Sequence, residues 1–280
     1  MDTRFLLTLL SVVDAGSFAS AARRENLTPA AVAQRIRSLE AALGKPLIVR
    51  SGQQVAPTQN CLSILPRLKK IAHDVAHIAA EFDQNGVSGP IRLGAISTAL
   101  SDRVPQVLSH FASQAPAATL NVTPGTSKEL YASLLDEELD AAFLVRPPFK
   151  TPKSITCVGV ETQPIVMITQ AADTRSPEKI IAQDKALIYD PGSWGGRLAT
   201  AWIKEHIPHE RVLCELDAVE AIAIAVGHGI GYSIIPAWGG LTELASVKRI
   251  NLAQIGQSRE LVLAHRRLNA QTLQLLGAQR

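Results

Sequence analysis

The stretch that decides the fold runs from Ala15 to Thr58 and reads AGSFASAARRENLTPAAVAQRIRSLEAALGKPLIVRSGQQVAPT. Gly16 can close the amphipathic helix predicted before it, and Ser17 can cap a short second helix. The pair Thr28-Pro29 is typical of a helix start, and Gly44 of a helix end. The pattern therefore predicts three successive helices, and the third has a buried stripe made of Val32, Ile36, Leu39 and Leu43.

The opposite face of the predicted third helix suits the major groove of DNA. Small residues near its start let the backbone come close, Gln can pair with adenine, and Arg can reach guanine or phosphate. An ordinary solvated helix face has the same periodicity, so spacing alone leaves both interpretations open. The candidate DNA-binding residues on and beside this helix are Ser17, Thr28, Pro29, Ala30, Ala33, Gln34, Arg35 and Arg37.

This region resembles, without a gap, the DNA-binding domain of LysR-type transcriptional regulators. The resemblance implies that the second and third helices form a helix-turn-helix and that Leu47 to Thr58 forms a wing. It adds Arg50, Gln53 and Gln54 to the candidate DNA contacts. The motifs that carry it are Gly16-Ser17-Phe18, Leu27-Thr28-Pro29-Ala30-Ala31-Val32, Ile36-Arg37-Ser38-Leu39-Glu40, Leu43-Gly44, Pro46-Leu47 and Pro57-Thr58.

Three positions depart from the family pattern. Ala33 stands where the family usually has Ser or Thr, Ile48 replaces the usual Phe, and Asn60-Cys61 replaces the common Ala-Gly. Ile48 keeps an apolar side chain and leaves the fold unaffected. Ala33 removes a hydroxyl from the expected groove face, so the operator sequence does not carry over from relatives.

Composition and charge fit a multidomain DNA-binding protein. The chain has 280 residues, 46% of them hydrophobic, which is more than one typical domain needs. Ten Lys and Arg face seven Asp and Glu through Asp83, with eighteen of each thereafter, so the net charge of +3 lies in the first segment. Such a bias is weak evidence for a polyanionic partner. No apolar stretch is long enough for a membrane span, and we expect a cytoplasmic protein.

The cysteines and histidines indicate neither a cofactor nor catalysis. Three cysteines at wide spacing predict no disulfide framework and no thiolate metal site, and the seven histidines are scattered. No catalytic motif is present, so we expect no enzyme and no cofactor. A thiol-based redox sensor using Cys157 or Cys214 is a narrower alternative.

A heptad seam follows the wing. Apolar residues recur at spacings of three and four from Cys61 onward, which favours a dimerising coiled coil over a helix that lies on its own domain. A dimer would hold two recognition helices at a fixed separation, so we expect an inverted-repeat operator. The candidate dimerisation residues are Ile64, Leu68, Ile71, Val75, Ile78 and Phe82.

Beyond a hinge at Gly86 to Pro90, strand and helix patterns alternate, which predicts an α/β domain with parallel sheets. The predicted strands are Ile91 to Ser97, Thr119 to Thr123, Ala141 to Val145, Ala186 to Tyr189, Val212 to Leu216 and Gly231 to Ile235. A middle segment, Val158 to Thr169 and then Lys185 onward, indicates a second lobe inserted into the first, with the chain returning at Glu260 to His265. The predicted helices are Val104 to Ala115, Lys128 to Glu138, Arg197 to His206 and Val219 to Gly227, with a further helix at the end. Gly227 to Gly231 is interpreted as a helix end leading into a strand, not as a dinucleotide fingerprint.

The family resemblance implies a two-lobed, periplasmic-binding-protein-like effector domain here. Hydroxyls at predicted helix starts, beside free backbone N–H groups, would favour a carboxylate or similar anion. Capping boxes, such as Thr126 with Glu129, explain part of the same pattern. The candidate effector contacts are Ser97, Thr98, Thr126, Ser127 and Trp194.

The fold prediction is a multidomain chain: an all-α winged helix-turn-helix, a coiled-coil linker helix and an α/β effector domain. The boundaries are 1–58, 59–87 and 88–280, with lobe I at about 88–160 and 265–280 and lobe II at about 161–264. The predicted function is a DNA-binding transcriptional regulator controlled by a small effector, a carboxylate or amino acid. We expect a homodimer or homotetramer, with RNA polymerase as a further candidate partner. The alternative is a cytoplasmic solute-binding or sensor protein that does not bind DNA.

Overall fold

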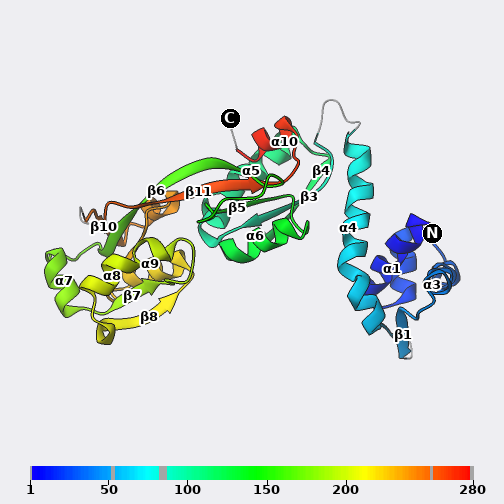
Figure 1. Ribbon diagram of the computed structural model, residues 1–280, viewed down its shortest axis with the longest axis horizontal. Coiled ribbons are helices and arrows are strands. Elements are labelled where there is room, and N and C mark those ends of the chain that lie inside the picture. Colours follow the sequence, from blue (N-terminus) through cyan, green and yellow to red (C-terminus); the bar gives the residue numbers. More distant parts are fainter. Residues whose placement is uncertain (1, 52–53, 82–86, 253–254, 278–280) are drawn as a thin grey trace. The chain divides into compact units, whose positions relative to one another are not determined.

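The computed structural model describes residues 2–51, 54–81, 87–252 and 255–277, and it divides into two compact units, 1–85 and 86–280 (Figure 1). Among the described residues, no helix combines the length and the apolar composition that crossing a membrane requires.

The first unit is a winged helix-turn-helix followed by a long helix, as predicted. Gly16 and Gly44 end their helices with φ of 64° and 65°. The hydroxyls of Ser17 and Thr28 accept the N–H groups of Ser20 and Ala31 and so cap α2 and α3. The elements are α1 (Thr3–Ala15), α2 (Phe18–Glu25), α3 (Pro29–Leu43), the antiparallel pair β1 (Ile48–Ser51) and β2 (Gln54–Pro57), and α4 (Gln59–Glu81).

One apolar core joins the three short helices. Val32, Ile36 and Leu39 of α3 are at most 2% exposed, which confirms three positions of the predicted stripe. Leu43, the fourth, is 41% exposed, because it is the last residue of α3 and lies outside this core. The other buried members of the core are Leu6, Leu9, Val12, Ala21, Ala22, Leu47, Val55, Cys61 and Leu68.

The apolar seam of α4 was predicted to face a partner helix, but part of it packs against its own unit. Cys61 and Leu68 are buried in the core of this same unit, and Ile64 and Ile71 pack against it. The first half of the seam therefore packs largely against α1 of its own chain, with Ile64 and Ile71 only partly covered. Val75 is the first seam residue to be exposed, at 38%. The side chain of Ile78 and all of Phe82 lie outside the described residues.

The second unit is built on two lobes whose strands form one hydrogen-bonded series, β4-β3-β5-β11-β6-β9-β7-β8. Lobe I contains β3 (Gly89–Ala95), β4 (Ala118–Pro124) and β5 (Ala141–Val145) with α5 (Ser97–Gln114), α6 (Ser127–Leu135) and α10 (Ala270–Leu275). Lobe II contains β7 (Ala186–Tyr189), β8 (Val212–Leu216), β9 (Tyr232–Pro236) and β10 (Val247–Ile250) with α7 (Pro177–Gln183), α8 (Thr200–His206), α9 (Val219–Gly227) and the 3₁₀ turns η1 (Gly196–Leu198), η2 (His209–Arg211) and η3 (Gly239–Glu243).

Two long strands connect the lobes (Figure 1). β6 (Thr156–Gln170) and β11 (Ser258–His265) pair antiparallel from His265 opposite Thr156 to Ser258 opposite Pro164, with an irregularity between Leu261 and Val262. β11 then pairs with β5 of lobe I, and β6 with β9 of lobe II. Both lobes are therefore attached to the same two-strand connection.

The prediction of parallel sheets holds only within the lobes. β3 is parallel to β4 and β5, and β7 is parallel to β8 and β9, whereas every pairing of β6, β10 and β11 is antiparallel. The carboxyl ends of β3 and β7 lead into the segments that carry the site described next.

Several boundaries differ from the prediction. α5 begins at Ser97, seven residues before the predicted start at Val104. Residues 97–103 have apolar side chains only at Ala99 and Leu100, too few to give a periodic stripe. The prediction missed α7 and β10. The segment Gly227 to Gly231 does end a helix and lead into the buried strand β9, as predicted, with positive φ at Gly229 and Gly231.

Candidate functional site

The recognition helix α3 presents part of the predicted face to solvent. Ala30, Gln34 and Arg37 are exposed, as are Thr28 and Pro29 at its start. Arg37 Nη2 donates to Gln34 Oε1 at 2.6 Å, so the guanidinium and the amide are held beside each other. Such a pair offers donors to base edges and phosphates together.

Two residues predicted on this face lie elsewhere. Ala33 is only 9% exposed, so placing it on the open groove face was wrong. A residue next to Val32 on the helix lies at the margin of the buried stripe, and a methyl group is small enough to be covered there. Arg35 was also misplaced, because its side chain turns inward.

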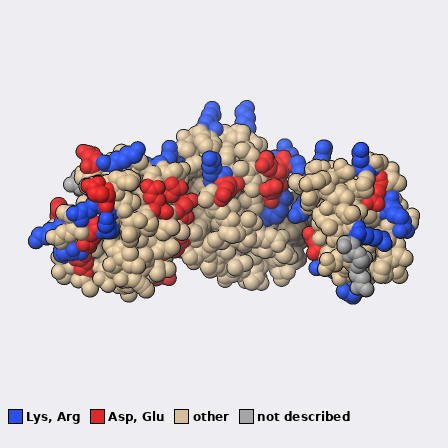
Figure 2. Space-filling view, turned by 90° about the horizontal axis from the view of Figure 1, so that it is seen from below, with Lys and Arg blue, Asp and Glu red and all other residues tan. Residues whose placement is uncertain are grey.

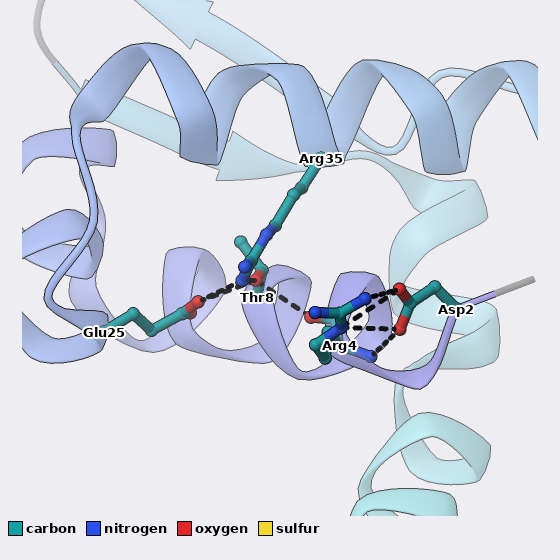
Figure 3. Close-up of polar contacts among 5 residues, drawn as sticks. All are labelled: Asp2, Arg4, Thr8, Glu25 and Arg35. Atoms are coloured by element: carbon teal, nitrogen blue, oxygen red, sulfur yellow. Dashed lines mark hydrogen bonds and ion pairs between the residues drawn. The ribbon is translucent and has the colours of Figure 1, made fainter.

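Arg35 is part of a polar cluster that joins all three helices of the fold (Figure 3). Its Nη1 donates to Thr8 Oγ1 at 3.0 Å and to Glu25 Oε2 at 3.1 Å. Thr8, which is fully buried, donates in turn to Glu25 Oε2 at 2.7 Å. The guanidinium therefore holds the helix-turn-helix together. The rest of Figure 3 shows Arg4 paired with Asp2 at the start of α1.

The wing brings a further basic group to the surface. Arg50 on β1 is exposed, and its Cζ lies 4.4 Å from the centre of the Phe18 ring at the start of α2. This cation–π contact holds the guanidinium at the junction of wing and helix-turn-helix. Gln54 is exposed, and Gln53 lies outside the described residues.

Surface charge agrees with the sequence bias. In Figure 2, Lys and Arg predominate over Asp and Glu on the visible face of the N-terminal unit, at the right, whereas both signs are intermingled on lobe II, at the left. A basic face is what a nucleic-acid-binding unit needs for phosphate contacts.

The second unit contains a cavity of about 460 Å³ between its lobes. From lobe I, the lining residues are Ile96, Ser97, Thr98, Leu100 and the six residues from Pro124 to Glu129. Lobe II supplies Tyr189, Asp190, Gly192 to Trp194, Asp217 and Val219. Arg259 of the connecting strand β11 completes the lining. All five predicted effector contacts, Ser97, Thr98, Thr126, Ser127 and Trp194, lie on this cavity.

Some of these hydroxyls have structural partners. Thr126 caps α6 in a capping box, in which its N–H and its hydroxyl both donate to Glu129 Oε2, at 2.9 and 2.8 Å. Ser127 Oγ accepts the N–H of Val145 at 3.0 Å and ties α6 to β5. By contrast, α5 begins with Ile96 as its N-cap and has no side-chain cap. The N–H groups of Ala99 and Leu100 donate to the Ile96 carbonyl, so those of Ser97 and Thr98 are the two that face the cavity without a capping side chain.

Arg259 is the residue that sequence reasoning missed. Its side chain is 1% exposed, and it donates to Gln163 Oε1 at 2.7 Å, to Thr98 Oγ1 at 3.1 Å and to Tyr189 OH at 3.5 Å. Burial lowers the pKa of this guanidinium. The available signal was an arginine two residues before the apolar run Leu261 to Ala264, which is fully buried.

Trp194 bridges the lobes through aromatic contacts. Its ring lies edge-on to Tyr131 of α6, with centroids 5.6 Å apart, and to Phe149, which follows β5, with centroids 5.5 Å apart. Trp194 itself follows β7 of lobe II, so these contacts connect the two sides of the cavity.

The sequence of both units matches one family. Residues 3–62 match the profile “Bacterial regulatory helix-turn-helix protein, lysR family”, and residues 84–276 match “LysR substrate binding domain”. The chain belongs to the LysR family. It is therefore a LysR-type DNA-binding transcriptional regulator with an effector-binding domain.

Similar proteins agree with this family. The “HTH-type transcriptional regulator CzcR” of Bacillus cereus is 28% identical to this LysR-type regulator over 237 residues, which are 84% of this chain and 80% of that protein. A “probable transcriptional regulator” from Pseudomonas aeruginosa has the same fold, with a TM-score of 0.71 at 16% identity, covering 99% of this chain and 96% of that one. Full-length CbnR, solved with its target DNA, has a TM-score of 0.64 at 18% identity, covering 99% and 98%.

Proposed function

We propose that this LysR-type regulator binds an inverted-repeat operator as a homodimer and responds to a small molecule held in the cavity between its lobes. The observation that carries the effector site is the cavity itself, which residues of both lobes and of the connecting strand line together. A ligand that touches both lobes stabilises their closed arrangement, because it binds that arrangement more tightly than the open one.

The exposed residues of the first unit define the DNA-binding surface. Gln34 and Arg37 on α3 are placed for base or phosphate contacts in the major groove. Arg50 and Gln54 on the wing extend this surface. The fold of the unit and the family it belongs to support this assignment.

Dimerisation is proposed for the later part of α4. Its earlier apolar residues are covered by the core of the same unit, whereas Val75 is exposed. Assembly into tetramers through the second unit, and contact with RNA polymerase, are compatible with this arrangement and belong to the same proposal.

DNA selection with the purified full-length protein tests the proposal. We expect a randomised duplex library to yield an inverted repeat, and affinity for it to fall steeply as salt rises. A set of small carboxylates and amino acids, added to the protein–operator complex, is expected to contain a compound that changes operator affinity. Failure to enrich any sequence would contradict the DNA-binding assignment and favour a sensor that does not bind DNA.

The structure gives no support to the thiol-sensor alternative. Burial raises the pKa of the Cys157 thiol, which disfavours the reactive thiolate. Cys157 is therefore not expected to make operator binding sensitive to peroxide, and the Cys214→Ser variant tests the second thiol.

A further inference from the structure

The cavity contains a buried positive charge that no carboxylate neutralises by contact. Arg259 is 1% exposed, and its three hydrogen-bond acceptors, Gln163, Thr98 and Tyr189, are all uncharged. Among the described residues, Glu161 and Glu220 act on it only at longer range, without forming an ion pair with it. A buried charge without a counter-ion is costly. An anion bound in the cavity would supply the missing partner.

The start of α5 strengthens this anionic subsite. α5 is an 18-residue helix whose N-cap, Ile96, makes no side-chain cap. Its first N–H groups, at Ser97 and Thr98, border the cavity and carry the positive end of the helix dipole. Thr98, 2% exposed, also contacts Arg259, so the helix start and the guanidinium lie side by side.

The same cavity carries a negative side. Asp190 and Asp217 of lobe II and Glu129 of lobe I all line it. Asp217 is exposed at the mouth of the cavity, but partial desolvation raises its pKa, and the neighbouring charges of Asp190 and Glu129 raise it further. Lys128 is the one other Lys or Arg in the lining, and it is exposed. A bound cation beside Asp217 would relieve the repulsion among these carboxylates.

Asp217 and Arg259 line the same cavity from different strands and segments. The charge of Arg259 offsets part of the rise in the pKa of Asp217, yet among the described residues no ion pair joins the two side chains. A small ligand with its own negative and positive groups would fill this gap and neutralise both sides. Much of the remaining lining is apolar and is formed by Ile96, Leu100, Pro124, Trp194 and Val219.

We infer that the effector is a zwitterion, an α-amino acid with an uncharged side chain, whose carboxylate pairs with Arg259 and the start of α5 and whose ammonium pairs with Asp217 and Asp190. This inference rests on the proposed function, in which the cavity holds the effector. The cavity volume of about 460 Å³ lies within the range of sites for small organic ligands.

Calorimetric titration of the full-length protein with three sets of probes tests the inference. The first set is the standard L-amino acids with uncharged side chains. The second is the matching carboxylic acids without the amine, and the third is the amino-acid amides without the carboxylate. At least one amino acid is expected to bind, and its two truncated analogues are expected to bind on the order of 100-fold more weakly, because each leaves a polar group of the site unpaired.

Two variants locate the charges. Asp217→Asn is expected to lower the affinity for the amino acid at least about tenfold, while the affinity for the amine-free acid stays nearly unchanged. Arg259→Gln is expected to lower the affinity for the amino acid and for the amine-free acid. Arg146→Gln is the matched control, because Arg146 pairs with Glu260 outside the cavity lining and is 42% exposed.

The outcomes separate this inference from the proposed function. If an amine-free carboxylate binds as tightly as the amino acid, or if none of the amino acids binds, the zwitterion assignment is wrong. The proposed function still stands in that case if another small molecule binds the protein and changes operator affinity. It fails if the protein binds no operator, or if no compound of any charge class alters that binding.

Discussion

Arg35 of α3 and Glu25 of α2 form an ion pair, with Nη1 and Oε2 3.1 Å apart and both side chains less than a quarter exposed. Arg37, two residues along the same helix, is exposed. The two arginines of α3 therefore have different roles, although periodicity placed both near the DNA.

We expect Arg35→Gln to lower the free energy of unfolding by about 1–3 kcal/mol, because Glu25 and Thr8 lose their charged partner. Arg37→Gln is expected to leave thermal stability unchanged and to weaken operator binding by about 1–3 kcal/mol per half-site. Thermal unfolding and fluorescence anisotropy on both variants give the comparison. Equal stability of the two variants would contradict the structural role of Arg35.

Val75 is a better position than Ile71 for testing dimerisation by mutation. Replacing Ile71 by a charged residue would disturb the core of its own unit, since Ile71 packs there. Val75→Lys is expected to shift the dimer towards monomer in analytical ultracentrifugation and to weaken operator binding. Asp74→Lys puts the same group one residue earlier on another face of α4, and we expect it to stay dimeric. A dimer of unchanged affinity in Val75→Lys would place the interface elsewhere.

The aromatic contact between the lobes should be measurable. Trp194→Leu removes two edge-on contacts, to Tyr131 and Phe149, and is expected to reduce stability by about 1–3 kcal/mol. We also expect small-angle scattering to show a wider distribution of lobe separations. Trp202→Leu, which alters a stack on His206 inside lobe II, should not change the scattering. Identical scattering from both variants would argue against the bridging role.

Substitution of two glycines that follow α9 distinguishes the cost of backbone strain from the cost of steric overlap. Gly231 has a φ of 96°, and a Cβ there would lie 2.1 Å from the carbonyl oxygen of Lys185. Gly229 has a φ of 81°, but its nearest neighbour, the Gln170 amide, would lie 3.4 Å away. We expect Gly229→Ala to cost about 1–2 kcal/mol in unfolding free energy, from strain alone. Gly231→Ala should lower the unfolding free energy clearly more. Equal losses for the two variants in chemical denaturation would show that a Cβ at Gly231 does not overlap the Lys185 carbonyl.

The pH dependence of lobe II stability follows from Asp173. Hydrogen bonds from the Arg175 side chain and backbone lower the pKa of Asp173 from 3.8 to about 2. A carboxyl whose pKa is lowered by folding stabilises the fold above its unfolded pKa, and loses this effect as pH falls from 3.8 towards 2. Asp173→Asn should therefore lower the melting temperature at neutral pH, with a difference that shrinks below about pH 4. A difference independent of pH would show that the charge of Asp173 does not matter.

Local signals were sufficient for most of the elements. Caps at Ser17 and Thr28 and glycines at positions 16 and 44 bounded the helices correctly, because a cap involves residues only a few positions apart. The strands at Ala141–Val145, Ala186–Tyr189 and Val212–Leu216 were placed without error, because a short apolar run is also a signal confined to neighbouring residues. α5 was predicted too short, since Ala99 and Leu100 alone do not make a periodic apolar stripe in its first turns.

Five residues of the cavity lining were also predictable from the sequence. Ser97, Thr98, Thr126, Ser127 and Trp194 follow strands or start helices, and parallel strands bring such positions to one edge. Their individual bonds were not predictable. Ser127 turned out to hold β5 and Thr126 to cap α6, which leaves the start of α5 and Arg259 as the polar groups best placed for a ligand.

The sequence by itself determined the helix-turn-helix, the wing and the alternation of strands and helices, because these depend on side chains close together along the chain. Only the tertiary structure decided which side chains are covered. Arg35 turns inward because Thr8 and Glu25 come from two other helices, and Arg259 is buried against Thr98, which lies 161 positions earlier. Burial depends on distant segments packing together, and spacing along one segment does not report it.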